Sequence, residues 1–170
     1  LHRGQILVAQ EDGKGKLQKL ASLQLAGALD DEFSEAGIVP DLGVTVDRAS
    51  SRFKLWAPTA SNVAICLYES SAGDATALEL MQRDEVTGIW SASQAGNLSG
   101  KYYQYLVDVF VPGVGMVRNR VTDPYSISLG LDSKRSYIAD LDDPALKPPG
   151  WDAAKAPARV AAQTDMVIYE

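Results

Sequence analysis

Residues 100–111 read Gly-Lys-Tyr-Tyr-Gln-Tyr-Leu-Val-Asp-Val-Phe-Val, and this is the longest strand pattern of the 170-residue chain. Successive side chains of a β-strand point to opposite faces of its sheet. One face collects β-branched and aromatic residues, namely Tyr103, Tyr105, Val107, Val109 and Val111. The other face mixes Leu106 and Phe110 with the polar Gln104 and Asp108. This period of two predicts a strand that places Tyr103 and Tyr105 in a hydrophobic core.

Shorter strand patterns surround this stretch on both sides. Alternating apolar residues occur at 53–56, 62–68, 89–92 and 116–121, and Gly-containing turns at 85–88 and 112–115 separate them. Short strands with turns at close intervals are typical of an antiparallel β-sandwich. We therefore predict an all-β chain whose residues 47–126 form an Ig-like antiparallel β-sandwich. Cys66 falls in one of these strands and is expected to be a small buried hydrophobe.

The region before the sandwich, 1–46, contains a strand pattern at 5–9, an Asp-Gly turn at 12–15 and a leucine-rich segment at 17–25. This order favours a hairpin, although Leu17, Leu20 and Leu23 also suit a short helix. Residues 28–46 form a polar connector whose acidic cluster, 30–32, is expected on a solvated face or at a helix start.

The region after the sandwich, 127–165, is rich in Pro, Asp and Ala and is predicted to be an extended linker on the surface of another domain. Tyr137 and Trp151 are the side chains expected to attach it there. Residues 166–170 read Met-Val-Ile-Tyr-Glu, an apolar strand pattern with nothing after it. An unpaired apolar strand is an association hazard, so it is expected to open a further domain.

Composition excludes several classes of function. The net charge of −6 and pI of 4.8 are unsuited to nucleic acid, and no apolar run reaches the ~20 residues of a membrane span. Cys66 and His2 are each the only residue of their type, which excludes a disulfide, a zinc cluster or a histidine triad within the chain. The acidic residues fall in turns and connectors, where capping is their ordinary use. We therefore assign no catalytic residue, metal ligand or cofactor to this chain.

Aromatic side chains are the remaining candidates for function, because sugar rings stack their apolar faces on tryptophan and tyrosine. Trp90 lies beside a turn and Tyr102 is another aromatic residue of the sandwich, and both are candidate substrate-binding residues. The alternative is that these aromatic residues fill the core or an interface.

Several motifs in this order resemble the pullulanases and limit dextrinases, debranching enzymes of glycoside hydrolase family 13. The resemblance rests on 53–60 (Phe-Lys-Leu-Trp-Ala-Pro-Thr-Ala), 88–91, 100–105, 122–126 (Thr-Asp-Pro-Tyr-Ser), 140–151 and 167–170. It implies that 47–126 form a carbohydrate-binding module of family 48 and that 1–46 end a preceding β-rich module. It further implies that 127–165 pack on the catalytic domain and that 166–170 are the first strand of its (β/α)8 barrel.

The resemblance also carries expectations about activity. The parent enzyme is expected to hydrolyse α-1,6-glucosidic bonds in pullulan, amylopectin or limit dextrins with carboxylates that lie after Glu170. Its partners are then an α-glucan and its own catalytic barrel, which Asp123, Pro124, Tyr125 and Trp151 are expected to contact. Calcium is plausible in the parent, and the resemblance leaves a secreted or cell-surface bacterial location or a plastid open.

One departure from the pattern concerns sugar binding. Starch-binding modules of this type carry tryptophans in two loops that read 69–74 and 112–115 here, and neither loop contains an aromatic residue. Two other interpretations therefore stay open: a free-standing starch- or glycogen-binding module without catalysis, and a plain Ig-like scaffold domain.

Overall fold

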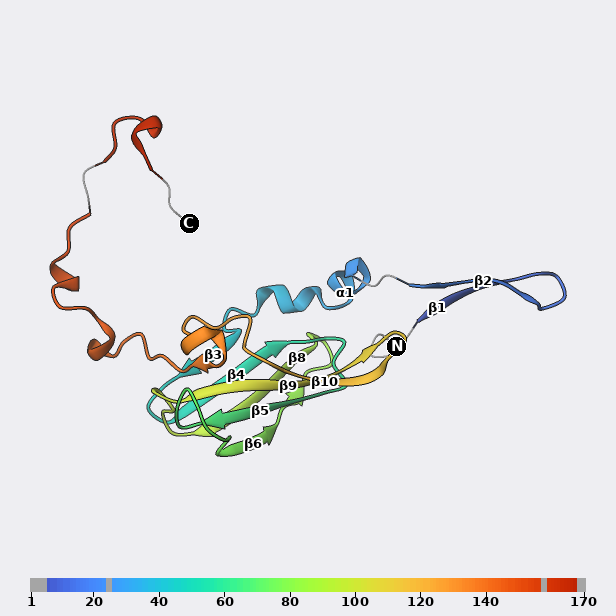
Figure 1. The fold of residues 1–170 in the computed structure, drawn as a ribbon, viewed down its shortest axis with the longest axis horizontal. Helices are drawn as coiled ribbons and strands as arrows, with labels where there is room; N and C mark the ends of the chain where they lie inside the picture. Colours follow the sequence, from blue (N-terminus) through green and yellow to red (C-terminus); the bar gives the residue numbers. More distant parts are fainter. Residues whose placement is uncertain (1–5, 24–25, 157–158, 168–170) are drawn as a thin grey trace. The chain divides into compact units, whose positions relative to one another are not determined.

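The computed structural model describes residues 6–23, 26–156 and 159–167 (Figure 1). The chain divides into two compact units, Leu1–Ala139 and Asp140–Glu170. All the strands belong to the first unit, and the second contains only short 3-10 turns among its described residues.

The first pair of strands is an antiparallel hairpin, as predicted. Strand β1 (Leu7–Glu11) pairs with β2 (Leu17–Ser22), and Leu7 lies opposite Ser22. Asp12 closes the turn, since its carboxylate accepts hydrogen bonds from the backbone N–H groups of Lys14 at 2.9 Å and Lys16 at 3.0 Å. The helix considered for the leucine-rich segment therefore does not form. Gln5, the first residue of the strand expected at 5–9, lies outside the described residues.

The connector contains two short helical segments. Helix α1 (Ala26–Glu32) holds the acidic cluster in its last turn, and the 3-10 helix η1 (Ser34–Ile38) follows it. Phe33 joins the two and is buried. It lies beneath the Arg83 guanidinium, 5.6 Å from the ring centroid, and thereby anchors the connector on the sandwich.

Two antiparallel sheets make up the sandwich, which confirms the predicted all-β architecture (Figure 1). The first sheet has the order β3-β4-β8-β7, formed by Gly43–Val46, Ser50–Trp56, Ile89–Ala95 and Gln82–Arg83. The second has the order β10-β9-β5-β6, formed by Gly115–Val121, Tyr102–Val111, Asn62–Tyr68 and Ala77–Leu80. A further short strand, β11 (Ser136–Tyr137), pairs with β9.

The hydrophobic core lies between these sheets. On β4 the inward residues are Ser51, Phe53 and Leu55, which alternate with the outward Arg52, Lys54 and Trp56. Phe53 packs edge-on against Tyr103 of β9, with ring centroids 5.1 Å apart. Tyr103 and Tyr105 are fully buried, so their predicted core position is confirmed, and Cys66 is buried as well. Edge-to-face aromatic pairs add to the stability that burial alone provides.

The sandwich extends further along the chain than the pattern indicated. Residues up to Ala139 belong to the first unit, whereas we expected an extended linker from residue 127. Strand β11 pairs Ser136 with Tyr103 and Tyr137 with Tyr102, and Ile138 enters the core. Tyr137 therefore packs on the module's own sheet. A strand of two residues is too short to show an alternating pattern, so the sequence did not predict β11.

The rest of the chain has 3-10 turns at Leu131–Ser133 in the first unit and at Pro144–Leu146, Trp151–Ala153 and Gln163–Asp165 in the second. Met166 and Val167 have no strand structure, and the remainder of the strand expected at 166–170 lies outside the described residues. No helix within the described ranges is both long and apolar enough to cross a membrane.

Candidate functional site

The outer face of the five-stranded sheet brings three tyrosines side by side. The strand register places Tyr102 of β9 between Tyr68 of β5 and Tyr137 of β11. The rings of Tyr102 and Tyr137 lie 5.1 Å apart in an edge-on arrangement, and both are half-buried. We call Tyr68, Tyr102, Gln104 and Tyr137 the tyrosine face. Tyr102 and Tyr137 are partly exposed in this face, whereas Tyr68 is 2% exposed.

Polar contacts hold the tyrosine face in place. The Tyr68 hydroxyl donates to Gln104 Oε1 at 2.8 Å, and Gln104 Nε2 donates to the Lys134 carbonyl at 2.7 Å. The Arg135 guanidinium lies 3.6 Å from the Tyr68 ring centroid and donates to the Ser70 carbonyl at 2.8 Å. Burial raises the pKa of Tyr68 above its ordinary value. Arg135 therefore covers Tyr68, and Tyr102 and Tyr137 are the rings that remain accessible.

The other candidate sugar platform, Trp90, lies in the core. Its side chain is 5% exposed, and its indole N–H donates to the Ala57 carbonyl at 3.0 Å. This burial leaves no face on which a sugar ring could stack. Trp90 instead ties the start of β8 to the segment that follows β4.

The expected domain-interface residues have different surroundings. Pro124 is exposed, Tyr125 is half-buried, and Trp151 of the second unit is 62% exposed. Asp123 is 4% exposed, and its carboxylate points into the module's own core. That carboxylate accepts hydrogen bonds from the Tyr103 hydroxyl at 2.7 Å, the Tyr105 hydroxyl at 3.4 Å and the Tyr125 backbone N–H at 2.8 Å. The contact predicted between these residues and a neighbouring domain stays a prediction.

Burial governs the titration of Asp123. Loss of solvent raises the pKa of this carboxyl above its ordinary value of 3.8, against the hydrogen bonds from Tyr103 and the Tyr125 backbone, which favour the charged form. Burial and the Asp123 charge together raise the pKa of Tyr103 and Tyr105, so both tyrosines stay protonated donors.

The raised pKa of Asp123 predicts a pH dependence of stability. Because the folded state holds this proton more tightly than the unfolded state, the stabilisation is complete below pH 3.8 and is lost as the pH rises through the folded pKa. We expect wild type to gain stability relative to Asp123→Asn as the pH falls from 7 to 4, measured by urea unfolding. Asp84 is the control, because hydrogen bonds from Thr87 lower its pKa, so wild type should lose stability relative to Asp84→Asn as the pH falls below 4. If the stability difference between wild type and Asp123→Asn does not change with pH, the prediction is contradicted.

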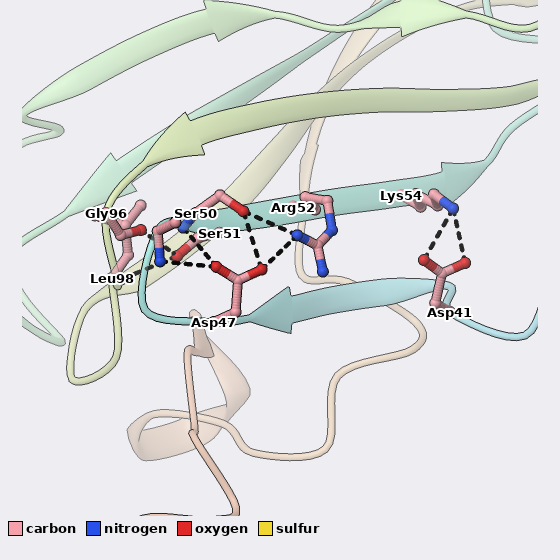
Figure 2. A network of polar contacts seen from close by, with 9 residues as sticks. Asp41, Asp47, Ser50, Ser51, Arg52, Lys54, Gly96 and Leu98 are labelled. Carbon is pink, nitrogen blue, oxygen red and sulfur yellow. Dashed lines mark hydrogen bonds and ion pairs between the residues drawn. The ribbon is translucent and has the colours of Figure 1, made fainter.

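A second polar network lies on the outer face of β3 and β4 (Figure 2). Lys54 Nζ pairs with Asp41 at 2.7 Å, and Arg52 Nη1 pairs with Asp47 at 2.6 Å. The Arg52 guanidinium, with the backbone N–H groups of Ala49 and Ser50, lowers the pKa of Asp47 to about 2. These pairs are partly exposed, and solvent and salt weaken the attraction within such pairs. Asp47 fixes the β3–β4 turn through the Ala49 and Ser50 N–H groups, and the two aspartates offset the charges of Arg52 and Lys54.

The described residues hold no group of three or more His, Cys, Asp or Glu side chains arranged to bind a metal ion.

Comparison with known proteins identifies the family to which this chain is similar. Residues 41–126 match the model described as carbohydrate-binding module 48 (isoamylase N-terminal domain). The chain is 36% identical over 168 residues to a pullulanase of Klebsiella pneumoniae, and the match covers 96% of this chain and 15% of that protein. It is 35% identical over 173 residues to the chloroplastic pullulanase 1 of Arabidopsis thaliana, covering all of this chain and 17% of the relative.

Solved structures show the same similarity. The ligand-free crystal structure of PulA from Klebsiella pneumoniae superposes with a TM-score of 0.84 at 34% identity, over 91% of this chain and 15% of that one. A pullulanase from Paenibacillus barengoltzii in complex with maltohexaose and α-cyclodextrin gives 0.66 at 32% identity, over 78% of this chain and 19% of that one. The chain thus spans less than a fifth of the length of these relatives. Since the family model covers half of its residues and the sheets superpose, the chain belongs to the carbohydrate-binding module 48 family.

Proposed function

We propose that the chain is the non-catalytic N-terminal portion of a pullulanase-type enzyme that hydrolyses α-1,6-glucosidic bonds in branched α-glucans. One observation carries this proposal. The family 48 match ends at residue 126, whereas the similarity to the Klebsiella pneumoniae pullulanase covers 96% of the chain. The segments on either side of the module therefore resemble a pullulanase too, which a free-standing binding module does not require.

The chain's own carboxylates support a non-catalytic role. Retaining glycoside hydrolysis needs two carboxyl groups about 5–5.5 Å apart on either side of the scissile bond. Among the described residues the buried carboxylate is that of Asp123, and two tyrosine hydroxyls and a backbone N–H already bind it. The reacting carboxylates of the proposed enzyme therefore come from another part of the protein.

The assay of this proposal uses the full-length enzyme that contains the chain. Pullulan consists of maltotriosyl units joined by α-1,6 bonds, so we expect it to release maltotriose, measured by chromatography and by reducing ends. Amylose contains α-1,4 bonds and is the matched control, from which we expect no release. Failure to cleave pullulan, or cleavage of amylose at a similar rate, would overturn the proposal.

The second candidate function, glucan binding by the module itself, is favoured by the accessible Tyr102–Tyr137 pair. We expect the 170-residue chain to be retarded in a native gel that contains amylopectin. Tyr102→Ala should weaken this binding about 3- to 10-fold, because it removes apolar ring surface that the sugar would cover, a loss on the order of 1 kcal/mol. Trp151→Ala, which removes an exposed aromatic ring in the other unit, should bind as wild type does. Equal retardation of wild type and Tyr102→Ala would remove the tyrosine face as the binding surface.

A further inference from the structure

A pocket of about 280 Å³ lies between the connector and the end of strand β4. Asp30, Phe33, Ser34 and Leu42 line it from the connector side, and Trp56 and Tyr125 from the sandwich side. We call it the Trp56 pocket. It is separate from the tyrosine face, since its sandwich residues belong to β4 and to the segment after β10.

The walls of the Trp56 pocket are held by contacts outside it. The indole N–H of Trp56 donates to the Thr87 carbonyl at 3.0 Å, so the polar edge of the ring is satisfied. Phe33 is buried against the turn at Gly88, where a Cβ atom would lie 2.8 Å from Pro58 Cβ and 3.1 Å from Phe33 Cδ1. Gly88 also has a φ of +68°, which glycine adopts without strain. The missing side chain lets the connector pack closely, and the pocket is therefore preformed.

The chemistry of the lining selects the kind of ligand. Trp56, Tyr125 and Leu42 offer apolar surface, and the Tyr125 hydroxyl remains a donor because burial raises its pKa. Asp30 is exposed and has no hydrogen-bond or ion-pair partner among the described residues. The lining contains no Lys or Arg, so an anion has no partner in the pocket. A pyranose ring fits this mixture, because its C–H faces are apolar and its rim carries hydroxyl donors for a carboxylate.

We propose that the Trp56 pocket binds a single glucosyl unit at the end of an α-glucan chain, as a second sugar site of the module. The inference rests on the proposed carbohydrate-binding function and adds a site to it. Pockets for drug-sized ligands measure about 300–1,000 Å³, so a volume of about 280 Å³, just below that range, suits one ring and not an extended segment. The aromatic wall and single carboxylate acceptor of the Trp56 pocket therefore favour the end of an α-glucan chain or a short branch.

Titration with two sugars tests this site. Maltotriose has chain ends, whereas α-cyclodextrin is a ring of the same glucosyl units without an end. We expect maltotriose to change the tryptophan fluorescence of the 170-residue chain and to lose this signal in Trp56→Phe, which keeps an aromatic ring in the wall. Asp30→Asn should weaken maltotriose binding about five-fold, since it removes a charged hydrogen-bond acceptor. Its neighbour Asp31 does not line the pocket, so Asp31→Asn should bind maltotriose as wild type does.

The outcomes separate this site from the tyrosine face. We expect Asp30→Asn and Trp56→Phe to leave the affinity for α-cyclodextrin unchanged, measured by calorimetry. If both variants bind maltotriose as wild type does while Tyr102→Ala abolishes binding, the pocket proposal is wrong and the glucan-binding module stands. If wild type binds amylopectin but shows no maltotriose-dependent fluorescence change, the pocket proposal is also wrong. Hydrolysis of pullulan by the full-length enzyme is an independent readout and is affected by neither result.

Discussion

Asp123→Ala is expected to lower the free energy of unfolding of the first unit by about 3–5 kcal/mol. The carboxylate is 4% exposed and accepts hydrogen bonds from Tyr103, Tyr105 and the Tyr125 backbone. Alanine leaves the buried Tyr103 and Tyr105 hydroxyls and the part-buried Tyr125 N–H without this acceptor, and each unsatisfied buried group costs about 1–3 kcal/mol. Urea unfolding followed by far-UV circular dichroism measures the change.

Asp84 provides a matched control for this effect. Its carboxylate also accepts three hydrogen bonds, from the Val86 N–H, the Thr87 N–H and the Thr87 hydroxyl, but it lies in an exposed turn. Water can replace the lost acceptor there, so Asp84→Ala should cost much less stability than Asp123→Ala. If the two alanine variants lose equal stability, burial is not what makes the Asp123 cluster important.

Trp90→Ala is expected to destabilise the module by about 3–5 kcal/mol, the range for removing a large aromatic side chain from a packed core. The indole is 5% exposed, belongs to the core cluster and donates a hydrogen bond to the Ala57 carbonyl. The variant therefore loses buried apolar area and leaves the Ala57 carbonyl without its partner. Urea unfolding at constant pH measures the difference.

The same substitution at Trp151 is the control. Trp151 is 62% exposed, so Trp151→Ala should change the free energy of unfolding by no more than about 0.5 kcal/mol. A Trp90→Ala variant that unfolds within about 1 kcal/mol of wild type would show that the indole is dispensable to the core, and Trp90 would return as a candidate for sugar binding.

The sandwich could be predicted because its strands carry a strong period of two. The alternation over β9 correctly placed Tyr103 and Tyr105 in the core, and the Asp-Gly turn correctly indicated the first hairpin. The helix in the connector could not be predicted in the same way, since α1 spans seven residues and buries none of them. A helix without a buried face has no apolar stripe for a pattern to reveal.

The residues of the candidate site could be predicted only in part from the alternating pattern. Tyr102 was a candidate because it is an aromatic residue of the sandwich, but its neighbour Tyr137 reaches it only through β11. Trp90 was a candidate for sugar stacking because it lies beside a turn. Its burial between the sheets depends on tertiary packing, which a local sequence pattern does not show. The covering of Tyr68 by Arg135 likewise joins residues that are distant in sequence, by a contact that no spacing rule anticipates.

Sequence alone therefore determined the all-β class, the inward face of the longest strand and the resemblance to debranching enzymes. These properties are local, because they follow from side-chain alternation and from short motifs. The tertiary structure alone decided which polar groups are buried and which aromatic rings are accessible. Asp123 turns into the core, Trp90 is covered, and Trp56 and Tyr125 line one pocket, because the two sheets and the connector bring together residues that are distant along the chain.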